Sequence, residues 1–110
     1  MSKIDCYAKS APYVTRGVQN EIPMPVQMAI WRAIAIMPRP RDYLQVFDLS
    51  RDIRHGETVQ IIRHSQEQPL FYQEYVIACP DAVDGYKLFA IDDGTGERDA
   101  HCVLMLAEEW

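Results

Sequence analysis

The segment from Met24 to Met37 constrains the fold of this chain most, because it is apolar except for Gln27 and Arg32. At 3.6 residues per turn, one side of a helix over this segment is wholly apolar, as in a helix that packs on a core; it carries Val26, Ile30, Ala33, Ile34 and Met37. The opposite side, which is charged in an ordinary surface helix, holds Met24, Met28, Trp31 and Ala35. A small sheet covers only one side of a helix, so the segment predicts a helix that needs a second cover.

The rest of the chain has the pattern of β-strands. Pro25 suits a first helical turn, and Pro38 and Pro40 end the helix. Strands are predicted over 13–18, before the helix, and over 43–49, 57–64, 71–78, 86–91 and 100–107, after it, with short connections. We expect an α+β fold, with one main helix packed on a mostly antiparallel sheet of about five strands in two layers. Residues 1–11 are expected to be a flexible leader or edge segment, and 12–110 a single domain.

Charge and cysteine usage narrow the class of protein. The formal net charge of −5 argues against general binding of nucleic acid or of a membrane surface. Most arginines nevertheless lie between Arg16 and Arg63, which indicates either solvated loops or a basic pocket for an anionic group. The cysteines form no CxxC motif, and with the histidines they match no zinc-finger spacing, so no metal or cofactor is expected. Without an apolar signal segment, the default expectation is a cytoplasmic protein.

Some of the predicted strands are apolar on both faces. In 71–78, Phe71 and Tyr75 lie on one face and Tyr72 and Val76 on the other, and 86–91 repeats the pattern. Together with the two-sided helix, this is more apolar surface than a chain of 110 residues covers alone. The alternatives are a strongly curled sheet or a homo-oligomer, and we favour the oligomer. The predicted interface residues are Met24, Met28, Trp31 and Trp110.

The candidate site residues gather around one polar stretch. His64, Gln66 and Glu67 form a dense cluster at a strand end, which indicates either a ligand or general-base site or a loop that caps its own backbone. If strand 13–18 pairs with the later strands, then Arg16, Arg32, Gln45 and His64 line one pocket. No serine or cysteine lies in a nucleophile motif, so no catalytic residue is assigned.

A series of short motifs resembles a known family. Thr-Arg-Gly-Val at 15–18, Leu-Gln-Val-Phe at 44–47, His-Ser-Gln-Glu-Gln-Pro at 64–69, Ile-Asp-Asp-Gly at 91–94 and Leu-Ala-Glu-Glu at 106–109 occur in order. Together they resemble a family of small bacterial and mobile-element proteins catalogued as the domain of unknown function number nine hundred and sixty. The resemblance covers roughly residues 13–109. It implies a small soluble protein of one domain and brings no assigned activity.

These observations lead to three functional hypotheses. The first is a non-enzymatic, homo-oligomeric binding protein that holds or sequesters a small anionic, nucleotide-like ligand at a subunit interface through Arg16, Arg32 and His64. The second is a protein-interaction or inhibitor module that docks through the apolar helix face, with Met24, Met28 and Trp31. The third is a small hydrolase that uses His64 and Glu67 as its acid–base pair.

Overall fold

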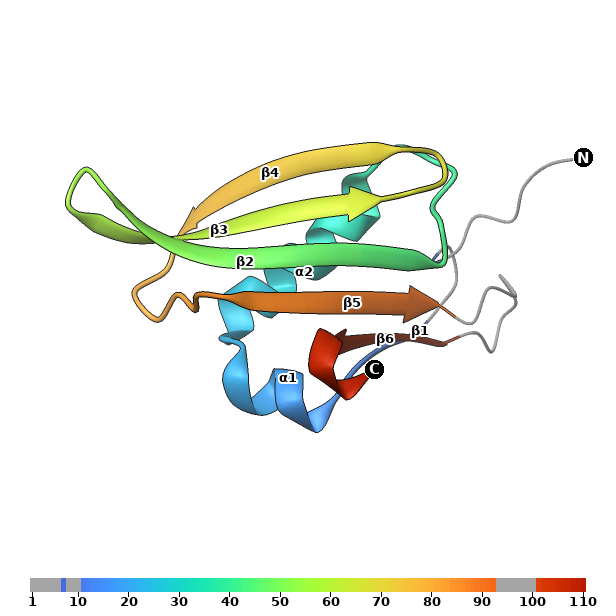
Figure 1. Ribbon diagram of the computed structural model, residues 1–110, viewed down its shortest axis with the longest axis horizontal. Helices are drawn as coiled ribbons and strands as arrows, with labels where there is room; N and C mark the ends of the chain where they lie inside the picture. Colours follow the sequence, from blue (N-terminus) through green and yellow to red (C-terminus); the bar gives the residue numbers. More distant parts are fainter. Residues whose placement is uncertain (1–6, 8–10, 93–100) are drawn as a thin grey trace, which may run out of the picture.

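The fold is a six-stranded sheet with one long helix on one of its faces (Figure 1). The computed structural model describes residue 7, residues 11–92 and residues 101–110. The elements are β1 (Ala11–Val14), α1 (Arg16–Glu21), α2 (Met24–Ile36), β2 (Leu44–Arg54), β3 (Glu57–Gln66), β4 (Phe71–Ala78), β5 (Tyr86–Asp92), β6 (His101–Leu106) and the 3-10 turn η1 (Ala107–Glu109). In the order β1-β6-β5-β2-β3-β4, every neighbouring pair is antiparallel except β1 and β6. The expected α+β class is confirmed.

Helix α2 packs on the sheet through the side that the sequence predicted to face the core. Val26, Ile30, Ala33 and Ile34 are buried. They join a cluster that includes, from the central strands, Phe47, Ile62, Leu88 and Leu104. Pro25 occupies the first turn, and the helical conformation ends before Met37, as the prolines that follow require. The core therefore lies between α2 and one face of the sheet.

The predicted strand over 13–18 is wrong beyond Val14. Thr15 has extended backbone angles, and its hydroxyl accepts a hydrogen bond from the Val18 backbone at 3.3 Å, which is the geometry of a helix N-cap. Arg16 is therefore the first residue of α1 and not part of a strand. The short helix was missed because Val18 reads equally well as a strand residue, whereas it is buried as part of the helix.

The hairpin of β2 and β3 is longer than the sequence indicated. The connection expected between the strands over 43–49 and 57–64 is reduced to His55 and Gly56, whose φ angles of 53° and 80° suit a tight hairpin connection. Because β5 pairs with β2 only up to Leu49, the hairpin tip extends past its neighbour (Figure 1). Within the described ranges, no helix is long and apolar enough to cross a membrane.

Candidate functional site

The polar cluster around His64 is part of the interior. Gln45, His64 and Gln66 are each at most 3% exposed. The Gln45 amide nitrogen donates to the Gln66 side-chain oxygen at 2.7 Å, and the Gln66 amide nitrogen donates to the Pro69 carbonyl at 2.8 Å. The Gln66 oxygen also accepts from the Asp42 backbone at 2.9 Å. The cluster therefore joins the loop before β2 to the loop after β3, and it satisfies backbone groups that burial would otherwise leave unpaired.

His64 itself is held as a neutral ring. Its Nε2 lies 2.7 Å from the Gln45 side-chain oxygen, its ring stacks on Phe47 at 4.4 Å, and Phe71 meets it edge-on at 5.2 Å. Burial lowers the pKa of His64 to about 4, because the charged form would lose its hydration. Its Nδ1 is buried without a hydrogen-bond partner among the described residues. A histidine in this setting supports packing and has no exposed nitrogen with which to reach a ligand.

The other predicted ligand residues do not join this cluster. Arg16 follows the edge strand β1, and His64 lies on β3; these two strands are four spacings of about 4.8 Å apart. Arg32 and Glu67 are exposed, on α2 and in the turn before β4. The structure thus brings Gln45, His64 and Gln66 together but places the two arginines and Glu67 elsewhere. Within the described ranges, no group of three or more His, Cys, Asp or Glu side chains is placed to hold a metal ion.

The predicted interface residues fall on two different surfaces. Met24 and Met28 are 61% and 65% exposed on the outer side of α2, as the sequence indicated. Trp31 is half-buried and packs against the core. Trp110 is 75% exposed and meets Phe89 edge-on at 6.2 Å, on the face of the sheet opposite α2. The two tryptophans therefore cannot belong to one continuous patch on the helix.

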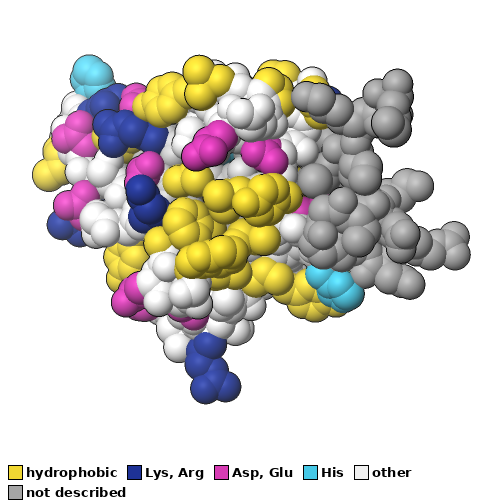
Figure 2. All heavy atoms as spheres, turned by 45° about the vertical axis from the view of Figure 1, so that its right-hand side comes forward, with side chains coloured by type: hydrophobic (Ala, Val, Ile, Leu, Met, Phe, Trp, Pro, Cys, Tyr) yellow, Lys and Arg dark blue, Asp and Glu magenta, His cyan; other side chains and the backbone are white. Residues whose placement is uncertain are grey.

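The sheet face opposite α2 carries a continuous apolar surface. Two cross-strand rows run over β2, β5 and β6. One row consists of Val46, Phe89 and Met105, and the other of Leu44, Ile91 and Val103. We call these six residues, together with the exposed Trp110, the open face. All six row residues are half-buried, although their neighbours in the same strands, such as Phe47 and Leu88, are completely buried against the helix side. Hydrophobic side chains gather in the middle of this region (Figure 2).

A row of charges borders the open face. In the strand order β4, β3, β2, β5, paired positions hold Glu74, Arg63, Asp48 and Lys87, so the sign alternates from strand to strand. Arg63 Nε lies 3.1 Å from a Glu74 carboxylate oxygen, and Lys87 Nζ lies 3.9 Å from an Asp48 carboxylate oxygen. All four side chains are partly exposed, so each pair alone contributes little to stability.

Most of the open face lies outside the residues predicted from the sequence. Phe89 and Ile91 lie on the second apolar side of the predicted strand over 86–91, but Leu44, Val46, Val103 and Met105 are not among the predicted site or interface residues. The signal was present, since Leu44 and Val46 alternate with Gln45 and Phe47 in a strand that is apolar on both sides. Periodicity alone does not say which of two apolar faces the helix covers.

Comparisons with known proteins support the fold only. The chain is similar to a crystal structure of a protein of unknown function from Enterococcus faecalis, with a TM-score of 0.64 and 24% sequence identity over 100% of this chain and 98% of that chain. No protein-family model matches the chain. No curated protein matches it either.

Proposed function

We propose that this protein is a non-enzymatic, homo-oligomeric binding protein whose subunits join through the open face of the sheet. The observation that carries the proposal is the pair of apolar cross-strand rows left half-exposed on the face opposite α2. The largest apolar patch on a typical monomer is about 300–600 Å² and is often functional, so this surface is a candidate interaction site. The interior position of His64 and the surface position of Glu67 give no support to the acid–base pair of a hydrolase.

A second copy of the same chain is the partner that the charged row favours. Consider a second copy rotated by 180° about an axis that runs parallel to the strands and passes between two neighbouring strands. Because the charges in the row alternate in sign, each charge near the axis then faces an opposite charge of the copy. Such an axis between β2 and β5 puts Asp48 of one subunit against Lys87 of the partner subunit. Face-to-face packing of two sheets, with strand directions within about 30° of each other, is a common arrangement.

The size of the surface sets a requirement on this dimer. Tyr13 continues one row onto β1, and Tyr72 continues the other onto β4 beyond Ser65 of β3, so that the surface reaches both edges of a sheet about 24 Å wide at a strand spacing of about 4.8 Å. With two rows along the strands, the apolar patch is on the order of 300 Å². A standard interface buries about 800 Å² on each partner. A stable dimer therefore also needs the charged row and Trp110 in contact.

The outer side of α2 supports a second candidate function, docking on a different protein. Met24, Met28 and Ile36 are 61%, 65% and 59% exposed there. Met24 and Met28 belong to the surface that the sequence predicted, whereas Ile36 does not, and a hydrophobic groove on a partner would accommodate such a helix face. The two candidates place the binding surface on opposite sides of the molecule, so substitutions distinguish them.

For the small anionic ligand, we propose only that Arg16 and Arg32 contribute to binding, without His64. Arg16 and Arg32 are exposed cations that suit an anionic group, but they are separated from His64, Gln45 and Gln66. We also propose that the chain belongs to the domain of unknown function number nine hundred and sixty, on the ordered motifs between Thr15 and Glu109. That assignment supplies no activity.

The experiment that tests assembly is native mass spectrometry of the wild type and two matched variants. We expect the wild type to show twice the chain mass of 12.7 kDa, Phe89→Lys to show the single mass, and Met28→Lys to remain a dimer. Lysine at Phe89 can extend its ammonium group to solvent, so the monomer should stay folded. Trp110→Ala, at a position outside the sheet, gives a second test with little risk to the fold.

The outcomes separate the alternatives. A wild type that is monomeric at tens of micromolar contradicts assembly through the open face. Loss of the dimer in Met28→Lys, with Phe89→Lys unchanged, assigns the interface to α2 instead. An additional mass of a few hundred daltons on the wild type would indicate a retained small ligand.

A further inference from the structure

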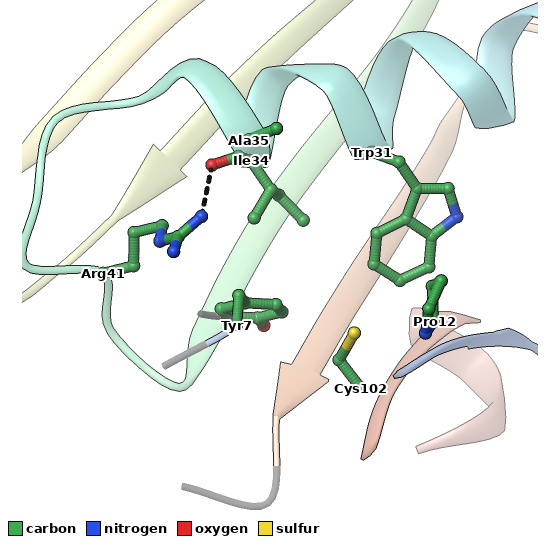
Figure 3. Close-up of a pocket in the computed structure, with 7 residues that line it drawn as sticks. All are labelled: Tyr7, Pro12, Trp31, Ile34, Ala35, Arg41 and Cys102. Carbon is green, nitrogen blue, oxygen red and sulfur yellow. Dashed lines mark hydrogen bonds between the residues drawn. The ribbon is translucent and has the colours of Figure 1, made fainter. Parts of the chain in front are cut away.

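A pocket lies on the helix side of the molecule, where α2 is separated from the β1–β6 edge of the sheet (Figure 3). Its volume is about 190 Å³. Trp31, Ile34 and Ala35 of α2 form one wall, and Figure 3 shows the indole of Trp31 directed toward Pro12 and Cys102 across the gap. The exposed Ala35 and the half-buried Trp31 lie at its solvent side. The site is thus a concave, largely apolar space with an aromatic wall.

The remaining walls are held by buried hydrogen bonds. Tyr7 is 8% exposed, and its hydroxyl lies 2.6 Å from the Ala90 carbonyl and 2.7 Å from the Tyr43 carbonyl. Arg41 is 5% exposed and donates from Nη1 to the Ile34 carbonyl at 3.2 Å, near the end of α2. These contacts fix the pocket shape before any ligand arrives, which lowers the entropy lost on binding.

The size and chemistry of the walls define what fits. An apolar cavity of about 150 Å³ is sufficient to bind benzene, so a volume of about 190 Å³ accommodates one aromatic ring. Trp31 offers an indole that such a ring can contact in an offset or edge-on arrangement. Arg41 has only donors, so any polar ligand atom beside it must be an acceptor.

We propose that this pocket binds a small planar ligand with a single ring and a hydrogen-bond acceptor, of the benzoate type. Benzyl alcohol, whose hydroxyl also accepts, is expected to bind more weakly, because a carboxylate is the stronger acceptor for a guanidinium. Benzylamine, whose ammonium group has only donors, is expected not to bind. The pocket and the open face lie on opposite sides of the sheet, so this proposal does not depend on how the subunits assemble.

Nuclear magnetic resonance of the two indole N–H groups tests the proposal. Titration with sodium benzoate should shift the Trp31 signal saturably, with a dissociation constant in the millimolar range or tighter, and leave the Trp110 signal in place. Ala35→Leu adds three carbon atoms at a helix position that borders the pocket. Because the pocket holds about one ring, this substitution should weaken benzoate binding at least about tenfold. Met24→Leu introduces the same side chain at an exposed α2 position about two turns before Trp31, away from the pocket, and should leave binding unchanged.

Several results would overturn the proposal. They are the absence of a saturable Trp31 shift with benzoate, equal shifts from benzylamine, and unchanged affinity in Ala35→Leu. Leucine favours the helix about as well as the alanine it replaces, so Ala35→Leu should remain folded. Its circular dichroism spectrum and the position of the unliganded Trp110 signal would verify this. A protein that is monomeric in the assembly test yet binds benzoate would support the pocket and contradict the dimer.

Discussion

Glu109, next to the last residue of the chain, accepts a 2.6 Å hydrogen bond from the hydroxyl of Thr15, at the start of α1. The same carboxylate oxygen accepts from the Leu106 backbone at 2.8 Å. Hydrogen bonds from Thr15, Leu106 and Gly17 lower the pKa of Glu109, so the carboxylate is charged at neutral pH, as suits the N-terminus of a helix. The C-terminal turn η1 is thereby attached to α1 across the sheet edge formed by β1 and β6.

This contact predicts an unusual effect of a glycine substitution. A Cβ built on Gly17 would lie 2.7 Å from the Glu109 carboxylate, so Gly17→Ala should displace that flexible side chain. We expect the loss of its hydrogen bonds from Thr15 and Leu106 to outweigh the helix propensity that alanine adds, and so to destabilise the protein. In a Glu109→Ala background the obstruction is absent, and the same substitution should stabilise by up to about 1 kcal/mol, because alanine favours a helix over glycine. Urea unfolding of the wild type, Gly17→Ala, Glu109→Ala and the double variant forms a double-mutant cycle that measures both effects. The same sign in both backgrounds would contradict the contact.

His64 predicts a pH dependence of stability. In the unfolded chain its pKa is near 6.5, and in the folded protein burial lowers it to about 4. Between these values the unfolded state binds more protons, so the free energy of unfolding is full above about pH 6.5 and decreases as the pH falls toward 4. The loss attributable to His64 is up to about 3 kcal/mol.

The measurement is urea unfolding between pH 5 and 7.5, with His64→Phe as the control. Phenylalanine retains the ring between Phe47 and Phe71 but cannot titrate, so the variant should show a flatter dependence on pH even if it is less stable. Equal slopes in the two proteins would show that His64 has the same pKa in the folded and the unfolded protein, and so is not kept neutral by burial.

A second buried amide predicts a large loss of stability. The Gln60 side chain donates to the carbonyls of Ser50 and Val83, both at 2.8 Å, and accepts from the Val83 backbone at 2.8 Å. Gln60→Leu leaves these backbone groups without their partner, so we expect a loss of about 2–4 kcal/mol. Gln73→Leu, at an exposed position on β4, is the matched control and should change stability by less than about 0.5 kcal/mol. Thermal unfolding of both variants tests the difference, and equal melting temperatures would contradict it.

The sequence predicted the main helix and most of the sheet because their patterns are long and local. Val26, Ile30, Ala33 and Ile34 repeat at helical spacing, and the predicted strand over 71–78 matches β4 at both ends. Helix α1 was missed because it has only six residues, too few for a clear period. The parallel pairing of β1 with β6 joins residues about 90 positions apart, and no local pattern reports such a contact.

The candidate site was harder to predict because burial is a property of the whole fold. His64, Gln45 and Gln66 are polar residues that usually lie at a surface, and only the structure shows them bonded to one another in the interior. The position of Trp31 on the helix is the same whether its side chain faces solvent or a pocket. Its side chain lines a pocket because Pro12 and Cys102, which are distant in the sequence, lie opposite it.

The charged row predicts the geometry of the dimer. Asp48→Lys places like charges beside Lys87 within the subunit and, for an axis between β2 and β5, across the interface as well. We expect this substitution to weaken the dimer about tenfold, because like charges that face each other across an interface repel. The double variant Asp48→Lys with Lys87→Asp restores opposite charges in both places and should recover the wild-type dissociation constant. Asp52→Lys, toward the hairpin tip and outside the row, is the control for a change in net charge.

Sedimentation velocity over a dilution series gives the dissociation constants of these four proteins. If Asp48→Lys and Asp52→Lys weaken the dimer equally, the effect is one of net charge, and the row does not lie in the interface. If Asp48→Lys weakens it selectively but the double variant fails to recover, Asp48 faces a residue other than Lys87 of the partner subunit, and the axis passes elsewhere. If Asp48→Lys weakens the dimer selectively and the double variant recovers the wild-type dissociation constant, the axis runs along the strands between β2 and β5. Such an axis would bring the apolar rows of both subunits into contact.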